Sequence, residues 1–490
     1  MSTTPEEPEQ STYLLVVLGA GVVLLWIAPI FSSFWLDETI TAWIVDDGFG
    51  EMFRRAFDHQ PMFPTYYMVA WVARSVGGAS EWVLRIPSLL AMALASVALA
   101  RLGTRLFDRE TGLLAAIVFA ISAPGAYAAT DARPYALGLL ALVVATLLLV
   151  RWLDTRNRWA AAGFAVAAAL VVYVHYLLAA ALVAHVVYAV RRRRAVGWAA
   201  LLAVGVGFLV LLLPLVPWFL DTYDRRSSLS LTPGTLRGVA LSLAPPTIVA
   251  ALLIGAFLSG RAVRAEATDL RAGRDELLLL ATWASAPPIL LFVASRVTGT
   301  GVFTPRYLLS ALPAIALLAG AGIRMLRPAR ARRTTMAIFF FLTVLVVGSI
   351  AHTTDAGRLE DWRGAARAAN ALVTDPTTPV ILQSGLIESG DVELLTDPEW
   401  LPYLLAPTTP YPIGGRIIAA PFDISAPEQG YLEELSRRLE GATRVVFVSR
   451  ESAIAVLGWV EGRLAVSGFR SRLIGRFGDL AVVTLERSTS

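Results

Sequence analysis

The sequence contains no cysteine and no lysine, and it has few charged residues of any kind. Without cysteine, no disulfide can hold an external domain and no thiolate can act as a nucleophile or metal ligand. Without lysine, any anion site must be built from Arg, His, hydroxyl groups and backbone amides. Only 16% of the 490 residues are charged, whereas about a quarter are charged in a typical soluble globular protein. The composition therefore argues against the ordinary soluble class.

Long apolar segments take the place of the missing charge. The chain is 56% hydrophobic and has a mean hydropathy of +0.62. A helix needs about 20 apolar residues to cross a hydrocarbon core about 30 Å thick. We therefore predict a polytopic α-helical membrane protein with about eleven transmembrane helices, counted from the apolar segments in the sequence. These segments are residues 13–31, 86–103, 111–128, 134–152, 159–174, 177–190, 198–220, 236–258, 276–294, 306–325 and 334–351.

The arginine clusters predict the orientation of these helices in a cell membrane. Arginine-rich short loops stay on the cytoplasmic side, which places Arg101–Arg109, residues 191–194, 260–275 and 324–333 inside. The net charge of +4 then reports orientation, and we expect no nucleic-acid partner. The segment that precedes residue 13 lacks the basic region of a cleaved signal peptide, so residues 13–31 are expected to remain as a span. The N-terminus is then inside and the C-terminus outside.

Residues 62–76 are the ambiguous part of this topology. The stretch MFPTYYMVAWVARSV is almost apolar enough for a span, but it is only 15 residues long and contains two tyrosines and a tryptophan. These side chains favour the membrane interface. We interpret the stretch as a helix on the outer membrane surface, within one long external loop at residues 32–85.

The composition changes after residue 351. Helix-like and strand-like stretches alternate from there, and the chain closes with two strands around a Gly-Asp turn in RLIGRFGDLAVVTLER. The pattern predicts two domains: a transmembrane domain at residues 1–351 and a small external α/β domain at residues 352–490. Other external stretches are expected at residues 130–134, 175–176, 221–228 and 295–306.

This topology collects polar residues from five loops at the outer ends of the spans. Taken one at a time, each has an ordinary explanation as a solvated acid, an interfacial arginine or a satisfied histidine. Two of the arginines, however, oppose the positive-inside bias. The set comprises Asp37, Glu38, Asp58, His59, Asp131, Arg133, Tyr135, His175, Tyr176, Arg306 and Tyr307.

The residue types in this set suit one kind of chemistry. Arginines at a membrane surface can clamp a phosphate bidentately. A carboxylate near that phosphate can take the proton of an incoming hydroxyl as a general base. The phosphate is then a leaving group attached to a lipid.

The order of the motifs resembles the GT-C superfamily of membrane glycosyltransferases, in particular the branch of protein O-mannosyltransferases and lipid A aminoarabinose transferases. The matching stretches are the LDE motif after the first span, HQPMFPTYYMVAW, RIPSLL, TDARPYAL and PRYLLSALPAIALL. They extend over residues 10–325. The external C-terminal domain matches nothing that we can assign.

The resemblance implies a polyprenyl-monophosphate sugar as donor and an inverting displacement at its anomeric carbon. It implies Asp37 as the general base with Glu38 beside it, and Arg133 and Arg306 on the donor phosphate. Asp131 would lie near the acceptor or an optional metal, and His59 and His175 would assist. Where some relatives have a lysine in the second external motif, this chain has His59 and Gln60.

Several alternatives stay open. The chemistry needs either no cofactor or a divalent metal, for which Asp37 and Asp131 are candidate ligands. The acceptor is a lipid, glycan or protein hydroxyl. The chain is alternatively a transporter or flippase of lipid-linked sugars, which predicts charged residues near the middle of the spans. A non-catalytic scaffold would leave the polar set without a purpose.

Overall fold

The computed structural model describes residues 6–60, 62–224, 234–258, 273–299, 301–326, 329–353, 360–439, 441–450, 454–466 and 468–487. Its backbone contacts divide the chain into two compact units. Unit 1 comprises residues 1–30, 60–66 and 85–347, and unit 2 comprises residues 31–59, 67–84 and 348–490. The predicted boundary at residues 351 and 352 stays a prediction, whereas the contacts group most of the loop at residues 32–85 with the C-terminal domain.

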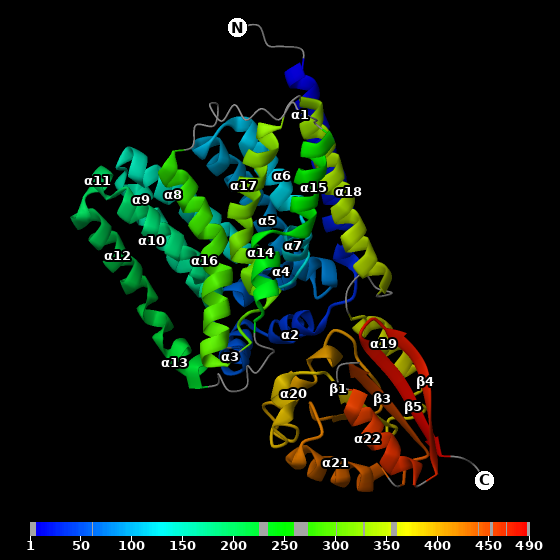
Figure 1. Ribbon diagram of the computed structural model, residues 1–490. Coiled ribbons are helices and arrows are strands. Elements are labelled where there is room, and N and C mark those ends of the chain that lie inside the picture. Colours follow the sequence, from blue (N-terminus) through cyan, green and yellow to red (C-terminus); the bar gives the residue numbers. More distant parts are fainter. Residues whose placement is uncertain are drawn as a thin grey trace. The chain divides into compact units, whose positions relative to one another are not determined.

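Unit 1 is a helical bundle (Figure 1). Its helices are α1 (Glu6–Val22), continued by η1 (Val23–Ile27) and η2 (Ala28–Phe31), α5 (Glu81–Leu106), α6 (Arg109–Ile121), α7 (Ala123–Ala129), α8 (Tyr135–Thr155), α9 (Arg158–Val174), η3 (Tyr176–Ala181), α10 (Leu182–Arg191), α11 (Arg193–Val196), α12 (Trp198–Leu212), η4 (Leu213–Leu215), α13 (Val216–Asp224), α14 (Leu236–Leu243), α15 (Pro246–Leu258), α16 (Arg274–Thr298), η7 (Pro305–Ala311), α17 (Leu312–Met325) and α18 (Ala329–Thr353).

The predicted spans correspond to helices in this bundle. Among the described residues, seven helices are long and apolar enough to cross a membrane, and two bent pairs raise that number to nine. Two shorter apolar helices, Arg158–Val174 and Tyr176–Arg191, correspond to the predicted segments 159–174 and 177–190. The prediction of a polytopic helical membrane protein is confirmed. The predicted loops at residues 225–228 and 260–272 lie outside the described residues.

Small residues allow the helices of the bundle to pack closely. A Cβ atom on Gly103 of α5 would lie 2.7 Å from the Cα atom of Gly112 in α6. A Cβ atom on Gly320 of α17 would lie 2.7 Å from the backbone nitrogen of Ala115 in the same α6. Close backbone approach at small residues is a usual way for membrane helices to associate. These glycines therefore fix α6 between α5 and α17.

The arginine clusters meet at one end of the bundle, as the sequence predicts. Arg105 at the end of α5 pairs with Asp154 at the end of α8 at 2.9 Å, and Arg192 contacts the same Asp154 at 2.9 Å. Arg324 and Arg332 pair with Glu110 at the start of α6 at 3.0 and 2.8 Å. The helix ends that carry these groups are therefore on one side of the bundle.

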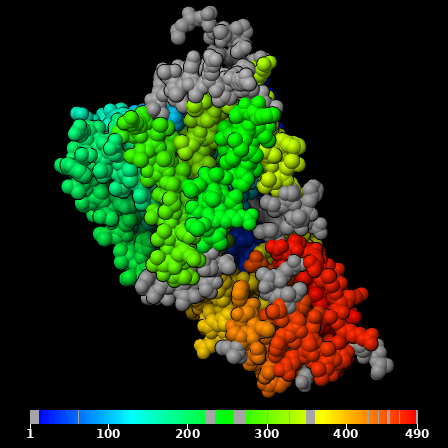
Figure 2. All heavy atoms as spheres, in the orientation of Figure 1, coloured from blue at the N-terminus to red at the C-terminus, as the bar shows by residue number. Residues whose placement is uncertain are grey.

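Other helices of unit 1 present apolar side chains to the surroundings. Only 6% of the most apolar window of Trp198–Asp221 is buried, and Phe257 of α15 is 82% exposed. In Figure 2 the side chains of α15 and α16, in green, are at the surface. Exposed apolar faces of this kind suit contact with lipid tails.

Unit 2 combines three helices from the long loop with the C-terminal α/β domain. The loop provides α2 (Leu36–Ile44), α3 (Phe49–His59) and most of α4 (Thr65–Gly77). Helix α4 covers the ambiguous stretch and is not among the candidate spans. The C-terminal domain contains α19 (Trp362–Asn370), β1 (Pro379–Gln383), η8 (Ile387–Gly390), α20 (Leu401–Leu404), η9 (Ala406–Thr408), β2 (Arg416–Ala419), α21 (Ala426–Leu439), β3 (Arg444–Arg450), α22 (Ile454–Ala465), β4 (Phe469–Phe477) and β5 (Leu480–Arg487).

The C-terminal domain is built on one five-stranded sheet with the order β2-β1-β3-β5-β4. Strands β2, β1 and β3 are parallel, and β5 is antiparallel to both β3 and β4. The β4–β5 turn has Gly478 at φ 64°, a left-handed conformation that glycine adopts without a steric penalty. The predicted small α/β domain with a closing Gly-Asp hairpin is confirmed.

Candidate active site

The two adjacent acids of the LDE motif have different environments at the start of α2. Glu38 is fully buried, and its carboxylate accepts a hydrogen bond from the backbone N–H of Trp35 at 3.3 Å. This contact is one half of a capping box, which satisfies a backbone donor at a helix N-terminus. Asp37 is partly exposed at the first turn of the same helix. The capping contact is structural, whereas the predicted place of Glu38 beside the catalytic base stays a prediction; Asp37 is the more exposed acid of the two.

A carboxylate from the C-terminal domain holds the same turn. Glu360 accepts a hydrogen bond from the backbone N–H of Leu36 at 2.8 Å. Glu360 is 1% exposed, and burial raises its pKa, with the negative charge of Asp37 acting in the same direction. Sequence reasoning missed this residue, because nothing in the stretch around Glu360 marks a partner 324 positions earlier.

The residues that precede α2 are held in a similar way. The backbone N–H of Phe34 donates to the hydroxyl of Tyr411 at 2.8 Å, and this hydroxyl donates to Glu81 at 2.6 Å. Arg363 pairs with Glu81 at 2.5 Å and donates from its backbone to the Ser33 hydroxyl at 3.1 Å. Burial and the Glu81 carboxylate raise the pKa of Tyr411, so its hydroxyl stays protonated as a donor. The segment before Asp37 is thus anchored through backbone donors.

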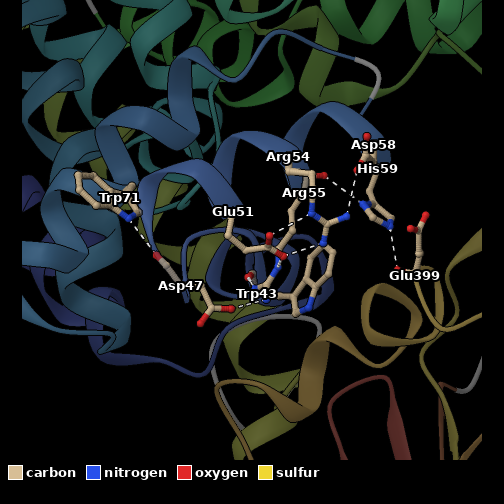
Figure 3. A network of polar contacts seen from close by, with 9 residues as sticks. All are labelled: Trp43, Asp47, Glu51, Arg54, Arg55, Asp58, His59, Trp71 and Glu399. Atoms are coloured by element: carbon tan, nitrogen blue, oxygen red, sulfur yellow. Dashed lines mark hydrogen bonds and ion pairs between the residues drawn. The ribbon is translucent and has the colours of Figure 1, made fainter.

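Two predicted binding residues on α3 have structural partners in unit 2 (Figure 3). Asp58 forms an exposed ion pair with Arg54 at 3.2 Å. His59 is buried, and its two ring nitrogens lie 3.1 Å from the backbone oxygens of Arg55 and Glu399. Its ring packs against the aromatic rings of Trp43, Trp400 and Tyr403. These contacts fit packing within unit 2, so the predicted substrate contacts of Asp58 and His59 stay predictions.

The ion pairs in Figure 3 also connect α2 with α3. Arg55 donates to the backbone oxygen of Trp43 at 2.5 Å and to Glu51 at 2.9 Å, and it also pairs with Asp47. Arg54 contacts the same Glu51 at 2.7 Å. The two guanidinium groups lower the pKa of Glu51 to about 2. The charges therefore fix the corner between the two helices.

Unit 1 brings together residues from three distant parts of the sequence. His175 lies between α9 and η3 and is buried, and the guanidinium charges of Arg133 and Arg306 both act on its imidazole. Arg133 precedes α8 and is 6% exposed, whereas Arg306 is partly exposed near the start of η7. The ring nitrogens of His175 have no hydrogen-bond partner among the described residues. Two guanidinium groups whose charges both act on one buried imidazole suit an anion that would contact all three.

Aromatic rings surround this cluster. The His175 ring lies 5.7 Å from Tyr135, 5.7 Å from Tyr176 and 5.0 Å from Tyr307, measured between centroids. The Arg306 guanidinium lies 5.4 Å from the Tyr307 ring centroid, a cation–π distance. Six predicted residues therefore meet in unit 1: Arg133, Tyr135, His175, Tyr176, Arg306 and Tyr307.

The backbone around Arg133 is fixed from α4 and α5. The Ser88 hydroxyl donates to the backbone oxygen of Arg133 at 3.4 Å, and it lies 3.3 Å from the hydroxyl of Tyr66. The backbone N–H of Arg133 donates to the backbone oxygen of Asp131 at 2.7 Å, and Asp131 is fully buried. Pro134 follows Arg133, and a residue before proline favours an extended backbone. Hydrogen bonds therefore hold both the N–H and the backbone oxygen of Arg133.

The described residues contain no group of three or more His, Cys, Asp or Glu side chains that could hold a metal ion. The candidate ligands Asp37 and Asp131 belong to different units. Whether the chemistry uses a divalent metal therefore stays open, as in the sequence analysis.

The fold is a multi-pass helical bundle with a small C-terminal α/β domain. Solved structures of membrane glycosyltransferases have a similar fold. ArnT from Cupriavidus metallidurans bound to undecaprenyl phosphate is 14% identical with a TM-score of 0.53, and the match covers 97% of this chain and 98% of that chain. The same enzyme in the apo state gives a TM-score of 0.55 at 14% identity and the same coverage. The arabinofuranosyltransferase AftD from Mycobacteria is 14% identical with a TM-score of 0.50, covering 98% of this chain and 40% of that one.

A sequence comparison points to the same class. Residues 58–218 match the family model of the dolichyl-phosphate-mannose-protein mannosyltransferases. A search of curated protein sequences finds no match. The predicted resemblance to the GT-C glycosyltransferases is confirmed, as is the prediction that the chain is of a glycosyltransferase class.

Proposed function

We propose that the protein is an inverting glycosyltransferase that uses a polyprenyl-monophosphate sugar as donor on the outer face of the cell membrane. An acceptor hydroxyl oxygen bonds to the anomeric carbon as the bond from that carbon to the phosphate oxygen breaks. The proton of the hydroxyl goes to Asp37, and the electron pair leaves with the polyprenyl phosphate. The acceptor is a lipid, glycan or protein hydroxyl.

The observation that carries the proposal is the convergence of Arg133, His175 and Arg306 in unit 1. Arginine pairs with phosphate through charge-assisted and often bidentate hydrogen bonds. The negative charge on the phosphate grows as the glycosidic bond breaks, so fixed cations favour the transition state over the ground state. The undecaprenyl phosphate in the structure of ArnT is consistent with a ligand of this class.

The environment of Asp37 supports its role as the base. It is the acid of the LDE motif that remains partly exposed, since the buried Glu38 serves as a helix cap. Its helix turn is held through backbone donors, so the carboxylate is presented from a fixed scaffold. A fixed base is more effective than a mobile one, because the geometry for proton transfer is set in advance.

The alternative function is translocation of lipid-linked sugars. Arg105, Asp154 and Arg192 lie at helix ends in one ion-pair cluster, and Arg133 and Arg306 precede the helical segments α8 and α17. A translocation path would need charges near the middle of the spans. This distribution favours an enzyme.

A donor panel tests the proposal. Purified protein in detergent is incubated with a series of radiolabelled polyprenyl-monophosphate sugars and a membrane extract as acceptor source. The proposal expects one donor to lose its sugar with release of polyprenyl phosphate. A protein that binds donors but leaves every one intact would be a flippase or scaffold.

A further inference from the structure

Three successive backbone N–H groups at the N-terminus of α2 donate hydrogen bonds to three side chains. The backbone N–H groups of Phe34, Trp35 and Leu36 donate in turn to Tyr411, Glu38 and Glu360. Only Glu38 belongs to the helix itself. The other two acceptors come from the C-terminal domain, more than 300 positions later in the chain.

Glu360 is the buried charge among these acceptors. Its carboxylate also accepts a hydrogen bond from the indole N–H of Trp362 at 2.7 Å and pairs with Arg450 at 2.7 Å. A buried carboxylate is costly unless its charge and lone pairs are satisfied. Here an arginine, an indole and a backbone amide satisfy the carboxylate and hold it from three sides.

The sheet fixes both members of the ion pair. The backbone of Glu360 forms a bridge with Gly478 in the β4–β5 turn, and the N–H of Asp361 donates to the Phe477 oxygen at 3.0 Å. Arg450 is the last residue of β3. It passes over Gly385, where an added Cβ atom would lie 2.5 Å from the Arg450 Cδ. The absence of a side chain at Gly385 therefore makes room for Arg450.

The Glu360 carboxylate accepts its backbone hydrogen bond from the first turn of α2. Leu36 is the first helical residue and Asp37 is the next. An acceptor at the first free N–H of a helix stabilises that turn and interacts favourably with the helix dipole. The charges of Glu360 and Asp37 also interact with each other. Any movement of Glu360 would therefore change both the direction and the electrostatic surroundings of Asp37.

We propose that Glu360 is a positioning residue, through which the C-terminal domain holds the first turn of α2 and orients Asp37 for proton transfer. The proposal rests on the role of Asp37 given above. It assigns a function to the C-terminal domain, which holds the catalytic helix in place by means of the Arg450–Glu360–Leu36 series of contacts.

Two variants separate positioning from general stability. Glu360→Gln keeps an acceptor for the Leu36 N–H and removes the charge. The double variant Glu360→Met and Arg450→Met removes the acceptor and leaves no unpaired buried charge, so its cost to folding is lower than that of losing one partner of the ion pair alone. Glu433→Gln is the matched control, since Glu433 pairs with Arg463 at the surface of the same domain.

Steady-state kinetics with the donor identified by the panel give the first measurement. We expect kcat to fall about tenfold or more in the double variant, because small displacements of a catalytic group cost large factors. The KM for the donor should stay within about twofold, since the proposed phosphate residues are unchanged. Glu360→Gln should retain more activity than the double variant, and Glu433→Gln should match the parent. A folded double variant with parental kcat, or a kcat reduced only in proportion to the folded fraction, would overturn the proposal.

Hydrogen exchange gives a second measurement that does not depend on the chemistry. The amides of residues 36–40 should exchange faster in the double variant than in the Glu433→Gln control, while those of β5 stay protected. Unchanged protection in α2 would also overturn the proposal. Slow turnover by Glu360 variants combined with full activity of Asp37→Asn would instead refute Asp37 as the base, so the two failures are distinguishable.

Discussion

Asp37 and Glu38 are adjacent at the start of α2, yet Glu38 is fully buried and Asp37 remains partly exposed. The difference follows from the capping box, which turns the Glu38 carboxylate back to the Trp35 N–H. The capping contact occupies the Glu38 carboxylate. We therefore propose that the pair divides into a structural acid and a candidate base.

The first prediction tests this division. Asp37→Asn keeps the shape of the side chain and removes the base, so we expect transfer to fall about 100-fold or more. Glu38→Gln keeps a side chain that can complete a capping box, so its activity should stay near the parental value. Glu38→Ala should instead lower stability, by about 0.5–2 kcal/mol. Turnover rates and thermal midpoints measure both effects, and an inactive Glu38→Gln beside an active Asp37→Asn would exchange the two roles.

The second prediction concerns the phosphate site. Replacing Arg133 or Arg306 by Ala removes a charge-assisted partner of the donor, so kcat/KM should fall by a factor equivalent to about 2 kcal/mol or more. Arg191→Ala is the control, because Arg191 pairs with Asp275 in a surface-exposed contact between α10 and α16. Parental kcat/KM values in both site variants would show that the donor phosphate binds elsewhere.

The third prediction separates stability from function at His175. Its imidazole is buried without a hydrogen-bond partner among the described residues, a condition that costs folding free energy. His175→Phe keeps an aromatic ring against Tyr135 and Tyr307 and removes that cost. We expect an equal or higher thermal midpoint together with lower turnover, as at a site where stability is given up for function. Unchanged turnover in His175→Phe would mean that His175 contributes only to packing.

The sequence was sufficient for the features that arise locally. Apolar length predicted the spans, and arginine placement predicted that Arg105, Arg192 and Arg324 lie at one end of the bundle. The shared outer side of the loops led to Arg133, His175 and Arg306. These signals are local because hydrophobic length and charge are read residue by residue.

The features that the sequence did not predict depend on distant partners. Strand β2 has only four residues, too few for a clear alternation, and its pairing with β1 defines it. The packing of the His59 ring among aromatic residues of the C-terminal domain could not be foreseen from the sequence, while its predicted substrate contact stays a prediction. The residues around Glu360 in the sequence do not indicate its hydrogen bond with the Leu36 N–H. Side-chain environment is set by tertiary packing, which a single sequence does not specify.

The fourth prediction is a pH dependence that arises from His59. Burial lowers the pKa of His59 below its ordinary value near 6.5. The folded state therefore favours the neutral ring, so the stabilisation is complete above about pH 6.5 and is lost as the pH falls towards the lowered pKa. Stability of unit 2 should decline below that pH, by at most about 1.4 kcal/mol per pH unit.

His59→Phe tests this prediction, since it keeps an aromatic ring that does not titrate. Trp43 and Trp400 flank His59, so unfolding in this region contributes to the change in tryptophan fluorescence. We expect the thermal midpoint of the parent to fall more steeply than that of His59→Phe between about pH 7 and pH 5. Parallel curves would mean that other groups control the acid sensitivity.

The last prediction is topological and uses the absence of cysteine from the chain. Eleven spans with α4 outside the membrane place Ser80 on the outer face and Arg105 on the cytoplasmic face. A single cysteine at Ser80 should react with a membrane-impermeant thiol reagent in intact cells, and Arg105→Cys should react only after permeabilisation. The parent protein is the blank, since it has no thiol to label. The reverse pattern would make α4 a span, and Arg105 would then be external, contrary to the charge bias that places its cluster inside. Such a result would also remove Arg133 from the outer face. Helix α5 separates Ser80 from Arg105, and α6 and α7 separate Arg105 from Arg133, so a change of side at Ser80 carries through to Arg133.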